Sequence, residues 1–140
     1  MKKVLFVCHG NICRSVMAEF IFKNMVSSDE YYVESAAVSR EEIGNDIYPP
    51  AKAVLREHGI PFELHRARQV TPADYDKFDE IYVMDSSNVR RIMSIFGEDP
   101  SGKVKLLLDK GIADPWYTGE FETTYKDIVE GCEALLNEIK

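Results

Sequence analysis

Near its amino end the chain reads Val4-Leu5-Phe6-Val7-Cys8-His9-Gly10-Asn11-Ile12-Cys13-Arg14-Ser15. The first four residues form a continuous β-prone apolar run, which predicts a strand buried on both faces of a parallel sheet. A polar, glycine-bearing loop follows, and apolar residues then recur at helical spacing from Val16 to Val26. The opening of the chain therefore predicts a buried strand, a tight loop and a helix, in that order.

The alternation of strands and helices continues to the carboxyl end. Further strands are expected at 31–37, 81–84 and 104–107. Helices are expected from Pro49-Pro50 to Gly59, from Thr71-Pro72 onward, from the capping residues Ser86 and Ser87 to Gly97, and from Tyr125 to Ile139. This order predicts an α/β fold: a single-domain three-layer sandwich over residues 1–140, with a central four-stranded parallel sheet and helices on both faces. Ligands of such folds bind at the carboxyl ends of the strands.

Composition and charge exclude several classes of protein. The chain has 140 residues and a net charge of −7, which fits one domain and disfavours nucleic acid and anionic lipid as partners. No run of about 18 apolar residues exists and the run Val4–Cys8 is too short for a signal peptide, so no membrane partner is expected. Three cysteines, Cys8, Cys13 and Cys132, do not make a disulfide framework, and a cytoplasmic location is expected.

The loop after the first strand carries the residues of an anion site. Gly10 has no side chain and Asn11 tolerates positive φ, so the loop can curl with its N–H groups directed inward. The following helix adds its positive end, and Arg14 can place two parallel N–H bonds on two phosphate oxygens. We expect a phosphate-binding loop made of His9, Gly10, Asn11, Ile12, Cys13, Arg14 and Ser15.

Cys8 begins this loop and is expected to ionise easily, because inward amides, a helix N-terminus and Arg14 all stabilise a thiolate. A thiolate beside a bound tetrahedral dianion suits in-line attack on phosphorus and a phosphocysteine intermediate. Ser15 can donate its hydroxyl to the sulfur and stabilise it as the leaving group of the second step.

The leaving group also needs a proton, and Asp114 is the best candidate for the acid. Pro115 biases Asp114 to an extended conformation. Trp116 and Tyr117 offer apolar walls that favour a protonated carboxyl and flat surfaces for an aromatic substrate. The same carboxylate can later activate the water that hydrolyses the phosphocysteine.

These motifs resemble those of the low-molecular-weight protein tyrosine phosphatases. That family carries Cys, five residues, Arg and Ser after its first strand, and a late Asp-Pro-aromatic motif; in this chain they are Cys8 to Ser15 and Asp114 to Tyr117. The resemblance covers nearly the whole chain. It implies a phosphotyrosine monoester hydrolase with no metal or organic cofactor, with phosphotyrosine proteins as substrates and inorganic phosphate as product and inhibitor. Cys8 matches the nucleophile, Arg14 the phosphate clamp and Asp114 the general acid and base.

The resemblance also implies supporting roles. Asn11, Ser15, Ser35 and His65 match a polar network that holds the loop's strained shape. Cys13 matches a second thiol that forms a reversible disulfide with Cys8 under oxidants.

The chain departs from the family's pattern at the loop and at the pocket. His9 stands where a small or aliphatic residue is frequent, and Val16 stands where proline is common. A pocket-lining aromatic aligns with Glu41 or Glu42, so a substrate pocket of Trp116, Tyr117 and Glu41 is expected to be more open, unless Tyr48 fills the gap.

Other activities fit the same scaffold. An arsenate reductase needs further cysteines as a relay; the region from Ile81 to Gly97 has none, and Cys132 is poorly placed. An arginine-phosphate phosphatase is the nearer alternative, although such enzymes favour Thr where His9 stands. A non-catalytic phosphate-binding module is disfavoured by the intact set of Cys8, Arg14 and Asp114.

Cys8, His9 and Cys13 lack a second metal-ligand pair, so no metal is expected. We expect a monomer.

Overall fold

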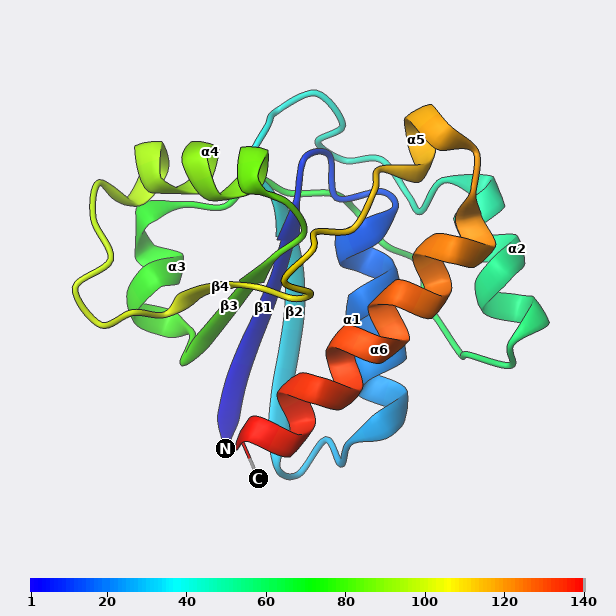
Figure 1. Cartoon of the computed structure of the whole chain (residues 1–140), viewed down its shortest axis with the longest axis horizontal. Coiled ribbons are helices and arrows are strands. Elements are labelled where there is room, and N and C mark those ends of the chain that lie inside the picture. Colours follow the sequence, from blue (N-terminus) through cyan, green and yellow to red (C-terminus); the bar gives the residue numbers. More distant parts are fainter. Residues whose placement is uncertain (140) are drawn as a thin grey trace.

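The computed structural model describes residues 1–139; residue 140, the last of the expected domain, lies outside the described part. The elements in chain order are β1 (Lys2–Cys8), α1 (Arg14–Met25), β2 (Tyr31–Ala37), α2 (Pro49–Glu57), α3 (Pro72–Lys77), β3 (Glu80–Val83), α4 (Ser86–Phe96), β4 (Val104–Leu106), α5 (Pro115–Thr118) and α6 (Phe121–Ile139). All the paired strands are parallel, and their order is β2-β1-β3-β4 (Figure 1). The predicted α/β class with a four-stranded parallel sheet is confirmed.

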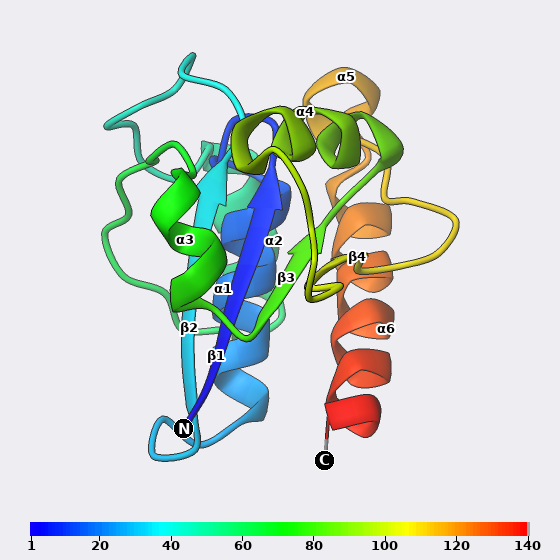
Figure 2. The same cartoon turned by 90° about the vertical axis from the view of Figure 1, so that its left-hand side faces the viewer.

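Helices cover both faces of the sheet, with α1, α2 and α6 on one side and α3 and α4 on the other (Figure 2). Strand β1 shows why its apolar run is continuous. Val4 and Phe6 belong to the core beneath α1 and α6, whereas Leu5 and Val7 belong to the core beneath α3 and α4. A strand at the middle of such a sandwich buries both of its faces. Within residues 1–139, no helix has the length and apolar character needed to cross a membrane.

Three helix starts differ from the sequence prediction. Helix α4 is capped by Asp85, whose Oδ1 accepts the Asn88 N–H at 2.9 Å, and not by Ser86 or Ser87. Helix α6 begins at Phe121 rather than Tyr125. Its first turn is mostly polar, so the apolar spacing that predicted this helix starts about one turn too late. The short helix α5 was not predicted; the pattern of a single turn is too brief to read.

The segment that leads from β4 to α5 is placed by a close approach of α6. A Cβ atom on Gly131 would lie 2.6 Å from Leu107 Cγ and 2.8 Å from the Leu107 carbonyl oxygen. Only a glycine allows α6 to come this near to the chain after β4. That chain runs on to Asp114, so this contact helps to fix where Asp114 lies.

Candidate active site

The loop between β1 and α1 folds back on the Cys8 sulfur. Asn11 adopts a positive φ of 62°, and its backbone N–H donates to Cys8 Sγ at 3.3 Å. Asparagine is among the few side chains that tolerate this conformation. Cys8 is only 3% exposed. A backbone donor is therefore already directed at the sulfur.

The Asn11 side chain holds the hydroxyl group that is hydrogen-bonded to the sulfur. Asn11 Nδ2 donates to Ser15 Oγ at 2.7 Å and to Ser35 Oγ at 2.9 Å. The Cys8 thiol donates to Ser15 Oγ at 3.0 Å. Once Cys8 is a thiolate, the Ser15 hydroxyl can donate to the sulfur instead, because its oxygen already accepts from Asn11. Ser35 in turn donates to Glu19 Oε1 at 2.6 Å. A buried chain of hydrogen bonds thus links α1 and β2 to the sulfur.

His65 holds the loop from the other side. Its Nε2 is 2.8 Å from the Asn11 carbonyl oxygen, and its backbone N–H donates to Asp46 Oδ1 at 3.0 Å. Asp46 also accepts from Lys52 Nζ at 2.6 Å. The structure therefore brings together the four residues expected in the polar network. Sequence reasoning missed Glu19 and Asp46, which contact that network only through residues distant in the sequence.

The charge on Asp46 should make the stability of this loop depend on pH. Burial raises the pKa of Asp46, but bonds from Lys52 and from the Ile47 and His65 N–H groups lower it to about 2. Because this pKa is below the unfolded value, the stabilisation is present at neutral pH and is lost as the pH falls from about 4 to about 2. Since solvent screens the carboxylate, Asp46→Asn should lower the free energy of unfolding by only about 1 kcal/mol at neutral pH and by almost nothing near pH 2. Urea denaturation at a series of pH values measures the difference; a difference that does not vary with pH would contradict the role of the charge.

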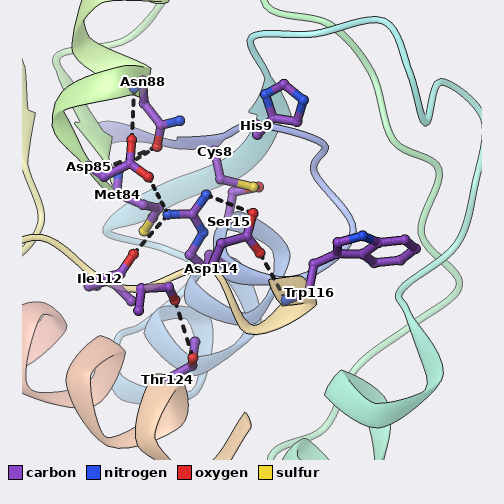
Figure 3. Close-up of polar contacts among 12 residues, drawn as sticks. Cys8, His9, Ser15, Met84, Asp85, Asn88, Ile112, Asp114, Trp116 and Thr124 are labelled. Atoms are coloured by element: carbon purple, nitrogen blue, oxygen red, sulfur yellow. Dashed lines mark hydrogen bonds and ion pairs between the residues drawn. The ribbon is translucent and has the colours of Figure 1, made fainter. Parts of the chain in front are cut away.

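Arg14 is buried and is held by three acceptors, on Asp85, Ile112 and Asp114, which are labelled in Figure 3. Its Nη1 donates to Asp85 Oδ2 and to the Ile112 carbonyl, both at 2.8 Å, and its Nη2 lies 3.3 Å from Asp114 Oδ2. Burial lowers the pKa of the guanidinium, but the charges of Cys8, Asp85 and Asp114 raise it above its usual value. Arg14 therefore stays charged at the floor of the site.

Asp85 is a site residue that sequence reasoning did not assign. Burial raises its pKa, but the bonds from Arg14 and from the Asn88 N–H hold that pKa below its usual range. Asp85 directly follows the predicted strand at 81–84, which neighbours β1 in the sheet. An acid at the carboxyl end of a neighbouring strand was the signal that could have identified it.

Cys13 and Cys132 are not set up as nucleophiles. Burial, with the negative charges of Cys8 and Asp114, raises the pKa of the Cys13 thiol, and burial raises that of Cys132. Both therefore stay protonated at neutral pH. All three cysteines are free thiols.

A cavity of about 130 Å³ opens above the loop. Its lining consists of Cys8, His9, Gly10, Ile12, Cys13, Arg14, Glu41, Glu42, Asp114, Trp116 and Tyr117. Trp116 and Tyr117 stand at the rim and are 53% and 82% exposed, so they form an open wall and do not enclose Asp114. Figure 3 shows the Trp116 ring on the outer side of the site, beyond Cys8 and Asp114. Tyr48 packs on Trp116 with ring centroids 4.8 Å apart, so it supports this wall from behind.

Asp114 reaches the cavity because it caps α5. Its Oδ1 accepts the Trp116 N–H at 3.0 Å, and its backbone is extended as expected before proline. The preceding residue is tied to α6, since Thr124 Oγ1 donates to the Ala113 carbonyl at 3.5 Å. The cavity therefore combines a sulfur that is hydrogen-bonded to a backbone N–H and a hydroxyl, a buried guanidinium and a carboxylate. This set can bind a tetrahedral oxyanion, attack it and exchange a proton with it.

Comparison with known proteins finds the same family that the motifs resemble. The sequence model of low molecular weight phosphotyrosine protein phosphatases matches residues 3–140. A human low molecular weight phosphotyrosine protein phosphatase is 40% identical, over 96% of this chain and 94% of its own. The crystal structure of a low molecular weight protein tyrosine phosphatase from Streptococcus pyogenes superposes with a TM-score of 0.97 and is 41% identical, over 100% of this chain and 94% of its own.

A solved structure of a Drosophila arginine phosphatase is also similar. It is 33% identical with a TM-score of 0.87, and the match covers 100% of this chain and 98% of that one. The fold is thus shared by proteins described as acting on different phosphorylated residues.

Proposed function

Because the chain belongs to the low molecular weight phosphotyrosine protein phosphatase family, it is a phosphoric monoester hydrolase acting on phosphotyrosine, and we propose that Cys8, Arg14 and Asp114 carry out its reaction. One observation carries the assignment of roles. The Cys8 sulfur accepts the Asn11 N–H at 3.3 Å and is hydrogen-bonded to Ser15 Oγ at 3.0 Å, in the same cavity as Arg14 and Asp114.

In the first step the Cys8 thiolate attacks phosphorus in line with the phenolic oxygen. The sulfur–phosphorus bond forms, the bond from phosphorus to the phenolic oxygen breaks, and Asp114 gives its proton to that oxygen. Arg14 and the loop amides hold the equatorial oxygens while charge builds on them. The products of this step are a phenol and a phosphocysteine.

In the second step a water attacks the phosphocysteine, and the Asp114 carboxylate takes its proton. Inorganic phosphate leaves and the Cys8 thiolate returns. The Asn11 N–H and the Ser15 hydroxyl stabilise this thiolate as a leaving group. A thiol without such donors would be a poorer leaving group at neutral pH.

Substrate binding has to change the contacts of Arg14. The Nη2 contact with Asp114 is the longest of the three, at 3.3 Å, and faces the cavity that both residues line. We propose that phosphate oxygens replace Asp114 there, while Asp85 and the Ile112 carbonyl keep the guanidinium in place. Binding would then release Asp114 for proton transfer.

Asp85→Asn tests this anchoring role. The amide still accepts one bond but no longer carries the charge opposite Arg14, so Arg14 is less well fixed. We expect kcat/KM for an aryl phosphate to fall by about tenfold, with weaker inhibition by vanadate. Asp109→Asn, an exposed acid after β4, is the matched control and should change neither quantity. Unchanged vanadate inhibition in Asp85→Asn would contradict the role.

The experiment that tests the proposed function is direct trapping of the intermediate. The protein is mixed with phosphotyrosine peptide, quenched in acid within the first turnovers, and digested for mass spectrometry. We expect one phosphoryl group on the peptide that contains Cys8. Label on another residue, or none during active turnover, would refute the role proposed for Cys8. Parallel assays with phosphoarginine test the alternative substrate, and faster hydrolysis of phosphoarginine would favour the arginine-phosphate activity.

A monomer in a reducing cytoplasm is also part of the proposal. The three free thiols suit a reducing compartment. Size-exclusion chromatography with light scattering tests the oligomeric state.

A further inference from the structure

We infer that Glu41 and Glu42 make this pocket select phosphotyrosines that are flanked by lysine or arginine. The inference rests on the proposed function, because it concerns the protein substrate of the same site. The two carboxylates are not a site of their own: they line the mouth of the cavity that holds Cys8 and Arg14.

The segment that carries these acids is fixed to the phosphate loop. The Val38 N–H donates to the Cys8 carbonyl at 2.9 Å, and the Ser39 N–H donates to the His9 carbonyl at 3.1 Å. The Ser39 hydroxyl donates to the same His9 carbonyl at 2.8 Å. His9 Nε2 then pairs with Glu41 Oε2 at 2.7 Å. Glu41 is therefore held beside the residue that directly follows the nucleophile.

Glu42 lies closer to the loop itself. Its Cγ is 3.3 Å from the position that a Cβ on Gly10 would take, so any larger residue at position 10 would press on Glu42. Its Oε1 accepts from Asn45 Nδ2 at 3.3 Å. The absence of a side chain on Gly10 leaves room for an acid directly against the loop.

The charges around the mouth leave a substrate's flanking residues facing negative potential. Arg14 is buried and faces the phosphate, and His9, which is a cation only when protonated, offsets at most one of the two carboxylates. The opposite wall, Trp116 and Tyr117, is uncharged. Arg40 precedes Glu41 and is exposed, but the described lining of the cavity does not include it. The net charge of −7 adds to the same field.

This field should discriminate between substrates by the sign of their flanking charge. Through water, one carboxylate changes the interaction with a single charge about 8 Å away by about two- to threefold in affinity. Exchanging Lys for Glu turns an attraction into a repulsion, so two carboxylates that each face one flanking charge give a ratio of at least about tenfold between basic and acidic peptides at low salt. Screening by salt should reduce that ratio, since the Debye length is about 10 Å at 0.1 M.

The test compares kcat/KM for three phosphotyrosine peptides that differ only in the residues at positions −1 and +1, which are Lys, Gln or Glu. We expect a Lys-to-Glu ratio of at least about tenfold at low ionic strength for the native chain. The variant E41Q/E42Q should reduce it to about threefold or less. The matched control D29N/E30Q removes two exposed acids at the amino end of β2, about 20 Å away along the strand, and should keep a much larger ratio.

A native ratio at or below one, or equal ratios in E41Q/E42Q and D29N/E30Q, would overturn the inference. The small substrate p-nitrophenyl phosphate, which has no flanking residues, keeps this outcome separate from a failure of the proposed function. If vanadate-sensitive hydrolysis of p-nitrophenyl phosphate is present while the peptide ratios fail, only the specificity inference falls. If that hydrolysis is itself absent, the proposed function falls first.

Discussion

Cys8→Ser should abolish turnover of every phosphomonoester, with a loss of at least about 10⁴-fold in kcat. A serine hydroxyl in this position would have to lose a proton, and the donors that face the sulfur, the Asn11 N–H and Ser15, provide no base to take it. No phosphoenzyme intermediate could then form. A water molecule that attacked the substrate directly would be a weaker nucleophile than the Cys8 thiolate. Initial rates with p-nitrophenyl phosphate at mildly acidic pH measure the loss.

The control for this variant is Cys132→Ala, which changes a buried thiol of α6 outside the cavity. It should retain catalysis, although the smaller side chain lowers stability by about 1–2 kcal/mol. Circular dichroism and thermal unfolding should show that Cys8→Ser folds like the native protein, because serine differs from cysteine by one atom and leaves no large cavity. A Cys8→Ser protein that is folded and still turns over substrate at about a tenth of the native rate would exclude the phosphocysteine mechanism.

Local patterns were sufficient to predict the central elements. The predicted strand at 31–37 coincides with β2, and the alternation of strands and helices led to the observed sheet. The tolerance of asparagine for positive φ led to the turn at Asn11, where φ is 62°. Each of these features depends on residues close together in the chain, which is where periodicity and backbone preference carry information.

The features that were missed depend on contacts between distant segments. Arg14 and Asp85 are 71 positions apart, and their ion pair exists because β3 lies beside β1. Glu19 reaches the active site only through Ser35 of β2. The role of Gly131 is visible only once α6 is docked against Leu107. A sequence pattern cannot specify such pairs until the order of strands is known.

Asp114→Asn should slow the release of poor leaving groups far more than that of good ones. The amide cannot give a proton to the leaving oxygen, so kcat for phenyl phosphate and phosphotyrosine should fall by about 10²–10³-fold. p-Nitrophenolate leaves readily without a proton, and its release should slow by only about tenfold. Release of phenol and of p-nitrophenol, measured in single-turnover mixing, separates the first step from hydrolysis of the phosphocysteine.

Asparagine is the more informative replacement because it can preserve the geometry of this position. The amide oxygen of the Asp114→Asn variant would still accept the Trp116 N–H that Asp114 Oδ1 accepts at 3.0 Å, so α5 keeps its cap. Asp114→Ala removes both the cap and the acid. Any loss of activity beyond that of Asp114→Asn therefore measures the effect of displacing α5. Equal losses for phenol and p-nitrophenol in Asp114→Asn would mean that Asp114 acts by holding Arg14 and Trp116 in place rather than by moving a proton.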